Sequence, residues 1–274
     1  MQITFTVKNN TYAADTASGK TIAIPVAFGG PQPNTYNVER ASAEPYRSGE
    51  FVGDVRQGGS CNFESYTMVP HCNGTHTECI GHITRERLSL HDVPQELAVP
   101  STLVSISPES GVHSGESYMP AFGLNDLAVT RGALEEALGD AEREWLNALV
   151  IRTLPNDGSK RERNYMEVPP PFFTNDAMLY IKELGVRHLL VDFPSLDRLF
   201  DDGMLSNHRI FWNVALGTAE ATPASLTNKT VTEMIYADNE LADGRYLLSM
   251  QYPSFIADAA PSKPVLYPIT EVRS

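Results

Sequence analysis

Basic residues are scarce in this chain. Lys and Arg number 21 against 34 Asp and Glu, and the formal net charge is −13 over 274 residues. A protein that binds nucleic acid without sequence preference needs clustered positive charge to neutralise phosphates, so this composition argues against that class. The basic cluster Lys160, Arg161 and Arg163 follows a turn sequence at 156–158. It is therefore predicted to lie on a solvated loop.

Long apolar runs and a disulfide framework are also missing. No uninterrupted apolar stretch approaches the roughly 20 residues of a membrane-spanning helix. The opening MQITFTVKNN lacks the charged, apolar and small-residue order of a secretory signal. The cysteines Cys61, Cys72 and Cys79 are an odd number gathered in one short segment, which argues against a disulfide scaffold. These features predict a cytoplasmic protein with reduced thiols that binds neither membrane nor nucleic acid.

Alternating and β-branched segments outnumber helical ones. Helical spacing of apolar residues predicts helices over 132–149 and 175–184, and each runs into an apolar strand-like stretch, 148–153 and 187–192. Further strands are predicted over 2–7, 21–28, 63–69, 102–106, 246–251 and 265–269. This order predicts a single α/β domain with a mixed sheet and flanking helices. Residues 1–45 are interpreted as an N-terminal extension packed onto a core of residues 46–274.

Potential metal ligands are concentrated in residues 71–82, HCNGTHTECIGH. Three of the seven histidines lie in these twelve positions, together with two cysteines and a glutamate. Imidazole, thiolate and carboxylate are all ligands of first-row metals. A straight strand over Cys72 to His82 would be roughly 33 Å long, too long for one metal. A bent path, with His76 and Glu78 as a short extended pair between Gly74 and Gly81, would bring the donors together.

Two other interpretations of this cluster are weaker. A buried cysteine, loop histidines and a capping glutamate would explain the residues singly, but functional sites concentrate such groups. A structural zinc usually uses paired Cys-x-x-Cys units, and none occurs here. An open, catalytic metal site is therefore the favoured hypothesis.

The segment CNGTHTECIGH at 72–82 resembles the H-x-G-T-H-x-D-x-P-x-H signature of the cyclase-type metal-dependent hydrolases. Bacterial kynurenine formamidase (arylformamidase) and isatin hydrolase belong to that group. The segment DFPSLD at 192–197, with His208 after it, resembles a second block of the family. Glu233 and the segment ADGRY at 242–246 resemble its late strand and hairpin. The resemblance extends over roughly residues 48–269.

The resemblance implies a fold of the swivelling β/β/α type, and homodimers or homotetramers. It also implies that Cys72, His76 and Glu78 hold one divalent metal ion. Glu78, His208 and Glu233 would hold a second ion if the site is binuclear. His82 would be the proton-transfer residue. One or two ions per chain are therefore expected.

Three residues depart from the family pattern. Cys72 replaces a histidine, Glu78 replaces an aspartate and Ile80 replaces a proline. A thiolate ligand favours softer metals, so zinc is expected ahead of manganese. Two assignments stay open: His71 could replace Cys72 at the bend, and Glu220 could replace Glu233 as the late carboxylate.

The predicted function is hydrolysis of a small amide or lactam-type C–N bond other than a peptide bond, in a small-molecule substrate. A metal-activated water would attack the carbonyl, and His82 would transfer the proton. One alternative is a cysteine hydrolase that uses Cys72 or Cys79 as nucleophile. Another is a metal- or ligand-binding family member without catalysis. Asp192 and Asp197 could serve either the site or turn formation, and His188 is interpreted as a core residue.

Overall fold

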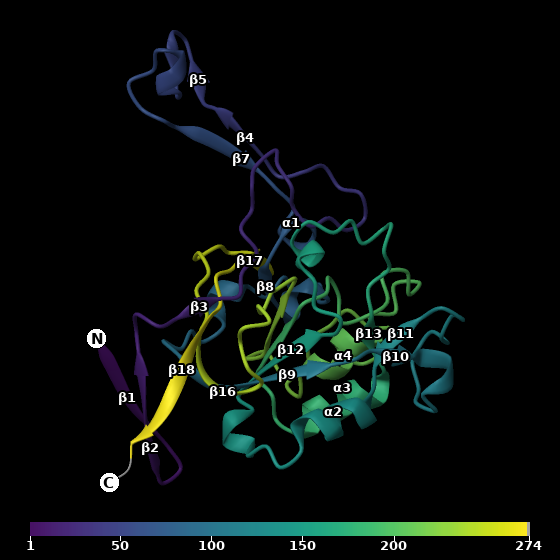
Figure 1. The fold of residues 1–274 in the computed structure, drawn as a ribbon. Helices are drawn as coiled ribbons and strands as arrows, with labels where there is room; N and C mark the ends of the chain where they lie inside the picture. Colours follow the sequence, from purple (N-terminus) through teal and green to yellow (C-terminus); the bar gives the residue numbers. More distant parts are fainter. Residues whose placement is uncertain (273–274) are drawn as a thin grey trace.

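An extended mixed sheet of eleven strands runs through the body of the molecule (Figure 1). The computed structural model describes residues 1–272 of the chain. In spatial order the strands are β1 (Gln2–Val7), β2 (Asn10–Asp15), β18 (Val265–Val272), β16 (Gly244–Ser249), β9 (Val99–Ile106), β12 (Ala148–Thr153), β14 (His188–Val191), β15 (Thr230–Glu233), β8 (His76–Cys79) and β17 (Ala259–Pro261), and β3 (Lys20–Thr21) also pairs with β18.

The middle of this sheet is parallel and buried on both faces. Strands β9, β12, β14 and β15 pair in parallel, and their connections contain α2 (Arg131–Leu138), α3 (Asn175–Glu183) and α4 (Ser206–Trp212). Along β12, Leu149 and Ile151 pack in the cluster that includes the helices, whereas Ala148 and Val150 pack in the cluster on the other face. Because successive side chains of β12 point to opposite faces of the sheet, the strand contributes to a hydrophobic core on each face.

Shorter elements surround the sheet. They are α1 (Pro70–Asn73), the three-stranded sheet of β10 (Glu109–Ser110), β11 (Leu127–Val129) and β13 (Phe172–Phe173), the pairs β4 (Ser42–Pro45) with β7 (Glu64–Thr67) and β5 (Arg47–Ser48) with β6 (Phe51–Val52), and 3-10 turns at Val55–Gln57, Ile80–His82, Leu90–Asp92, Gly111–His113, Arg143–Trp145 and Gly158–Arg161. No helix within residues 1–272 has both the length and the apolar composition needed to cross a bilayer.

Residues 42–67 form an arm that projects from the body (Figure 1). Its side chains Tyr46, Phe63 and Tyr66 are exposed. The rings of Tyr46 and Phe63 lie 5.0 Å apart, and Tyr66 stacks on Phe28 at 4.7 Å. Exposed apolar clusters are common at protein–protein contacts. The homodimer or homotetramer expected from the resemblance stays a prediction.

The first 45 residues contribute strands to the large sheet. β1 pairs with β2, and both β2 and β3 pair with β18 near the other end of the chain. Ala23 then forms a bridge with Ile235, two residues beyond Glu233. This segment therefore lies against the strand that carries a predicted site residue. The division into an extension of residues 1–45 and a core of residues 46–274 stays a prediction.

The predicted fold class is confirmed, because the chain is a single α/β domain with a large mixed sheet and few flanking helices. The helix predicted over 132–149 instead ends at Leu138. Gly139 follows with a φ of 47°, which interrupts the helix. The strand predicted over 21–28 is confined to β3, and α4 was not predicted.

The prediction of a solvated basic loop is wrong for Lys160. Its ammonium is buried and lies 2.7 Å from the Asp192 carboxylate, and it also donates to the carbonyl oxygen of Thr153 at 2.6 Å. The turn at Gly158–Arg161 directs this side chain inward. Asp192 therefore belongs to a buried ion pair that ties this turn to the end of β14, rather than to the cluster of metal-binding donors.

Candidate metal centre

Strand β8 forms the base of the site. His76 and Glu78 are two residues apart on this strand, so their side chains lie on the same face. β8 pairs antiparallel with β15 on one side and with β17 on the other, and Glu233 lies directly opposite His76. The His76 Nε2 atom is 3.3 Å from the Glu233 carboxylate. Strand pairing therefore brings a residue from late in the chain next to the early motif.

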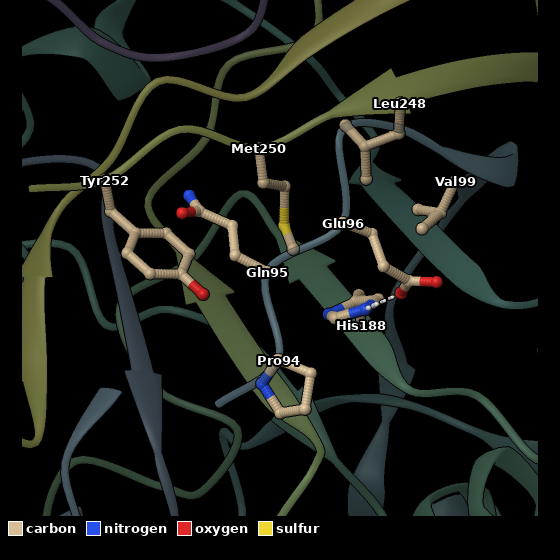
Figure 2. Close-up of a pocket in the computed structure, with 8 residues that line it drawn as sticks. All are labelled: Pro94, Gln95, Glu96, Val99, His188, Leu248, Met250 and Tyr252. Carbon is tan, nitrogen blue, oxygen red and sulfur yellow. Dashed lines mark ion pairs between the residues drawn. The ribbon is translucent and has the colours of Figure 1, made fainter. Parts of the chain in front are cut away.

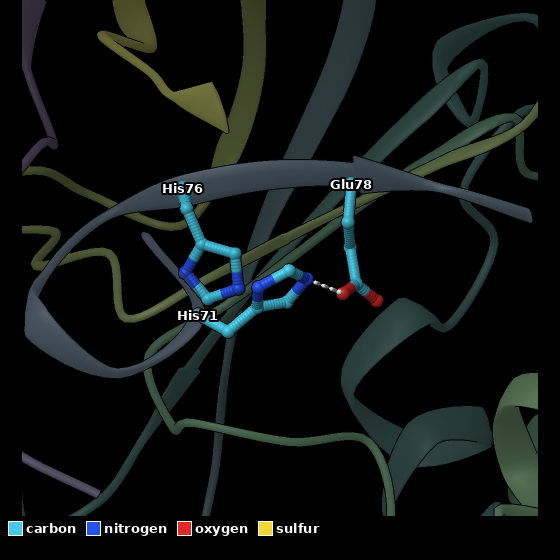
Figure 3. Close-up of side chains that lie close together, drawn as sticks. All are labelled: His71, His76 and Glu78. Atoms are coloured by element: carbon cyan, nitrogen blue, oxygen red, sulfur yellow. Dashed lines mark ion pairs between the residues drawn. The ribbon is translucent and has the colours of Figure 1, made fainter. Parts of the chain in front are cut away.

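The helical turn α1 carries both His71 and Cys72. Figure 3 shows the His71 ring beside His76 and Glu78 of β8. Successive helical residues point about 100° apart, so His71 and Cys72 cannot face the same way. The His71 Nε2 atom lies 3.4 Å from a Glu78 carboxylate oxygen. Cys72 is buried but belongs to none of the donor groups that the described residues form, and His71 belongs to two of them. The structure therefore places His71, and not Cys72, among the clustered donors, and the assignment of Cys72 as a ligand stays a prediction.

Helix α4 contributes His208 from above the strand. The His208 Nε2 atom is 3.2 Å from one Glu78 oxygen and 3.6 Å from Glu233. Its other ring nitrogen lies 2.7 Å from the Asp197 carboxylate, which also accepts the backbone N–H groups of Asn207 and His208. A carboxylate behind an imidazole fixes the orientation of a metal ligand. Asp197 therefore supports the site through His208.

His82 and Asp258 lie at the outer side of the cluster. The His82 Nδ1 atom is 3.7 Å from Glu78 and 3.5 Å from Asp258. The turn that carries His82 requires glycine at position 81, because a Cβ there would lie 1.8 Å from the Leu88 carbonyl oxygen. Asp258 precedes β17, and its carbonyl oxygen accepts the N–H of Cys79 at 2.9 Å. Pairing of β17 with β8 thus positions a carboxylate that lies far from the motif in sequence.

The donor atoms fit a divalent metal ion. Buried side-chain atoms without a hydrogen-bond partner, within residues 1–272, include His71 Nε2, His76 Nε2, His208 Nε2 and both Glu78 carboxylate oxygens. The other nitrogen of His76 contacts the Gly74 carbonyl oxygen at 3.0 Å, which leaves Nε2 free for a ligand. Two ligands of a tetrahedral zinc ion are separated by about 3.4 Å. The N···O distances in the cluster, 3.2–3.7 Å, match that spacing.

Charges in the cluster are strongly coupled. Burial lowers the pKa of His71, but the Asp258 and Glu78 carboxylates outweigh it and raise the pKa to about 10. Burial also opposes protonation of His208, yet Asp197, Glu233 and Glu78 hold its pKa well above the usual value. Despite complete burial, the neighbouring imidazoles hold the pKa of Glu78 well below its usual value. The carboxylates thus create a field that attracts a cation, which a proton satisfies when no metal is bound.

Most of the predicted site residues lie together. His76, Glu78, His82, His208 and Glu233 form one contiguous cluster. Glu220 is exposed on the loop after α4, so Glu233 is the late carboxylate that reaches the site. Sequence reasoning missed Asp258 altogether. No spacing or motif around it indicated a ligand, and only strand pairing reveals it.

His188 lies outside this cluster, beside a separate small cavity (Figure 2). The cavity has a volume of about 10 Å³, which is marginal for one water molecule, so it is not a substrate site. The buried imidazole contacts the Thr230 hydroxyl at 2.8 Å and lies 3.6 Å from Glu96. The interpretation of His188 as a core residue agrees with this environment.

Lowering the pH below about 6.5 is expected to destabilise the protein through His188. Burial, and then the charge of Arg187, lower its pKa to about 4 in the native state, whereas the unfolded chain titrates near 6.5. Between these values the unfolded state binds more protons, so stability decreases as the pH falls. The expected contribution at pH 5 is about 2 kcal/mol. Urea unfolding of the protein and of His188→Asn at pH 5 and pH 7 measures it, and equal pH sensitivity would contradict it.

Known proteins are similar to this chain in sequence and in fold. A model of the family described as "Putative cyclase" matches residues 2–198. A kynurenine formamidase of Bacillus cereus is 24% identical over 240 residues, which cover 87% of this chain and 95% of the relative. The kynurenine formamidase of Bacillus anthracis is 23% identical over 222 residues, 80% and 87% of the two chains.

Two solved structures show the same fold. A potential metal-dependent hydrolase with cyclase activity has a TM-score of 0.61 at 17% identity, over 91% of this chain and 96% of the other. Isatin hydrolase A of Labrenzia aggregata has a TM-score of 0.59 at 13% identity, over 92% and 94%. The family match begins at residue 2, earlier than the resemblance noted from residue 48 onward.

Proposed function

The chain belongs to the cyclase family, and we propose that, as a metal-dependent hydrolase of this family, it cleaves a small amide or lactam-type C–N bond. The relatives named above are kynurenine formamidases, and a similar structure is an isatin hydrolase. Both chemistries add water to a carbonyl carbon and release a nitrogen leaving group. The proposal therefore names the bond type and leaves the side groups of the substrate open.

One observation carries this proposal: five buried donor atoms without hydrogen-bond partners belong to His71, His76, Glu78 and His208, which lie in overlapping donor groups that share Glu78. Buried polar atoms are almost always satisfied, and leaving several unpaired costs several kcal/mol in total, on the order of 1–3 kcal/mol each. One or two divalent ions bound in these groups would supply the partners that the five atoms lack. The proposed ligands are His76, Glu78, His208 and Glu233, with His71 in place of Cys72.

Each of these residues has a separate role in the proposed reaction. The bound ion supplies Lewis-acid activation of water and of the carbonyl group. Glu78 and Glu233 supply negative charge, and Asp197 holds the His208 ring in place. His82 is more exposed and stands at the side of the cluster, where it can accept the proton of the attacking water and donate one to the leaving nitrogen.

The choice of metal is argued from the proposed ligands, in which His71 takes the place of Cys72. Zinc was expected ahead of manganese because of the Cys72 thiolate. With His71 instead, the ligands are imidazoles and carboxylates, which suit zinc and also accept manganese. We propose zinc as the first choice, with one or two ions per chain.

A cysteine nucleophile has less support. Burial, and then the charge of Glu233, raise the pKa of Cys72 to about 11, and burial raises the pKa of Cys79 to about 11. Both thiols are therefore protonated near neutral pH, whereas nucleophilic cysteines have a lowered pKa. The Cys79 thiol also donates to the Leu88 carbonyl oxygen at 3.3 Å.

A cytoplasmic location and a small-molecule substrate are part of the proposed function as a metal-dependent hydrolase. The three free cysteines fit a reducing compartment.

Hydrolysis of N-formyl aromatic amines and lactams by the purified protein tests the proposal. We expect turnover of at least one member of such a panel, loss of activity after chelation, and recovery when zinc or manganese is added back. Elemental analysis of the same sample gives the metal content. Turnover that survives metal removal would favour the cysteine alternative, and bound metal without turnover across the panel would favour a non-catalytic family member.

A further inference from the structure

The outer side of the cluster contains a further set of donors, His71, His82 and Asp258, of which Asp258 lies far outside the 71–82 segment. The ring nitrogens of His71 and His82 lie 3.2 and 3.5 Å from the same Asp258 oxygen. The two rings stack with centroids 4.6 Å apart and planes 26° apart. His71, His82 and Asp258 each have a potential ligand atom that lies within 4.8 Å of those of the other two residues.

From this geometry we propose that His71, His82 and Asp258 form an additional, exchangeable metal position, outside the buried ligands, whose occupation inhibits the enzyme. The inference rests on the proposed function, because the one or two tightly bound ions of that proposal would be held by the buried ligands. Two imidazoles and one carboxylate leave coordination positions open for water, which is typical of sites that exchange ligands.

Burial separates the two positions. The side chains of His71, His82 and Asp258 are 27%, 30% and 29% exposed, whereas those of Glu78, His208 and Glu233 are at most 4% exposed. The outer position can therefore exchange its ion with solvent while the buried ligands retain theirs. Charge also makes the affinity for a metal ion higher at the buried ligands than at the outer position. Glu78 and Glu233 can neutralise a buried dication, but Asp258 offers only one negative charge to the outer one, so binding there is weaker.

His71 is the residue on which the two positions compete. Its Nε2 atom lies 3.4 Å from Glu78 and 3.2 Å from Asp258, so it can serve the buried ion or the outer ion. An outer ion also occupies the Nδ1 atom of His82. Because His82 is the proposed proton-transfer residue, filling the outer position would remove it from the reaction.

Zinc titration of the purified protein tests this inference by binding and by rate. Equilibrium dialysis against increasing free zinc is expected to show the one or two tightly bound ions of the buried ligands and one additional, weaker ion per chain. Asp258→Asn should keep the tightly bound metal and bind the weaker ion at least about a hundredfold less well, since one of three ligands is lost. Asp92→Asn removes a nearby exposed carboxylate and should match the unmodified protein. Hydrolysis should rise and then fall with zinc, and Asp258→Asn should relieve the fall.

A second variant reports ligation directly. Asp258→Cys places a softer donor at the same position, and cobalt bound there should show a new thiolate-to-metal charge-transfer band that the unmodified protein lacks. This readout holds even if Asp258→Asn folds poorly, which thermal melting would reveal. A weaker ion that binds equally to Asp258→Asn, or a single class of bound ion together with no new band, would overturn the inference and leave the proposed function intact. A protein that binds no metal at all would instead contradict the proposed function.

Discussion

Replacing His76 by alanine is expected to remove most of the bound metal while the protein stays folded. His76 is completely buried at the base of the cluster, and its Nε2 atom lies 3.3 Å from the Glu233 carboxylate. Without it, Glu233 loses its partner on the neighbouring strand, and the buried ligand set becomes incomplete. Because even residues behind a ligand change metal affinity by about 10- to 100-fold, loss of a ligand should exceed that range. Elemental analysis after dialysis against a weak chelator measures the effect, and circular dichroism measures folding.

His188→Ala is the matched control for this variant. His188 is also a buried histidine on a strand of the same sheet, but it belongs to none of the donor groups formed by the described residues. Its replacement should lower stability and leave the metal content unchanged. A His76→Ala protein that retains its full metal content would contradict the ligand assignment, whatever its activity.

Replacing His82 by alanine is expected to lower turnover by about a hundredfold or more, the usual contribution of a general acid–base residue. The tightly bound ion should be retained, because the buried ligands do not include His82. Steady-state kinetics on a substrate identified by the screen measures kcat and KM, and elemental analysis of the same sample measures the metal. The loss should appear in kcat, since His82 acts on the transferred proton rather than on substrate binding.

Added imidazole should restore part of the lost activity if His82 transfers protons, because the small base can enter the space that the side chain leaves. His91→Ala provides the control, since His91 is exposed on the turn Leu90–Asp92 and is also a histidine close in sequence. Loss of the tight ion in proportion to the loss of activity would show that His82 is a ligand of the first ion instead.

Local sequence patterns were sufficient to predict how His76 and Glu78 lie on strand β8 at the base of the site. The spacing of His76 and Glu78 predicts that both lie on one face of an extended pair, and β8 has that form. The resemblance indicated His208 and Glu233, and both reach the cluster. The strands β9, β12 and β14 were also predictable, since a continuous apolar run indicates a buried strand whatever its partners are. In contrast, Gly139 ends α2 with a left-handed backbone that periodicity alone does not reveal.

The sequence by itself therefore determined the fold class and the segment that carries most of the candidate ligands. Only the tertiary structure decided which atoms meet. Whether His71 or Cys72 faces Glu78 depends on the rotation of the single helical turn α1, because neighbouring residues there point about 100° apart. Asp258 reaches the site because β17 pairs with β8, and Lys160 is buried because its turn faces Asp192. Such contacts join residues far apart in the chain, and their energies depend on burial and charge that no local pattern contains.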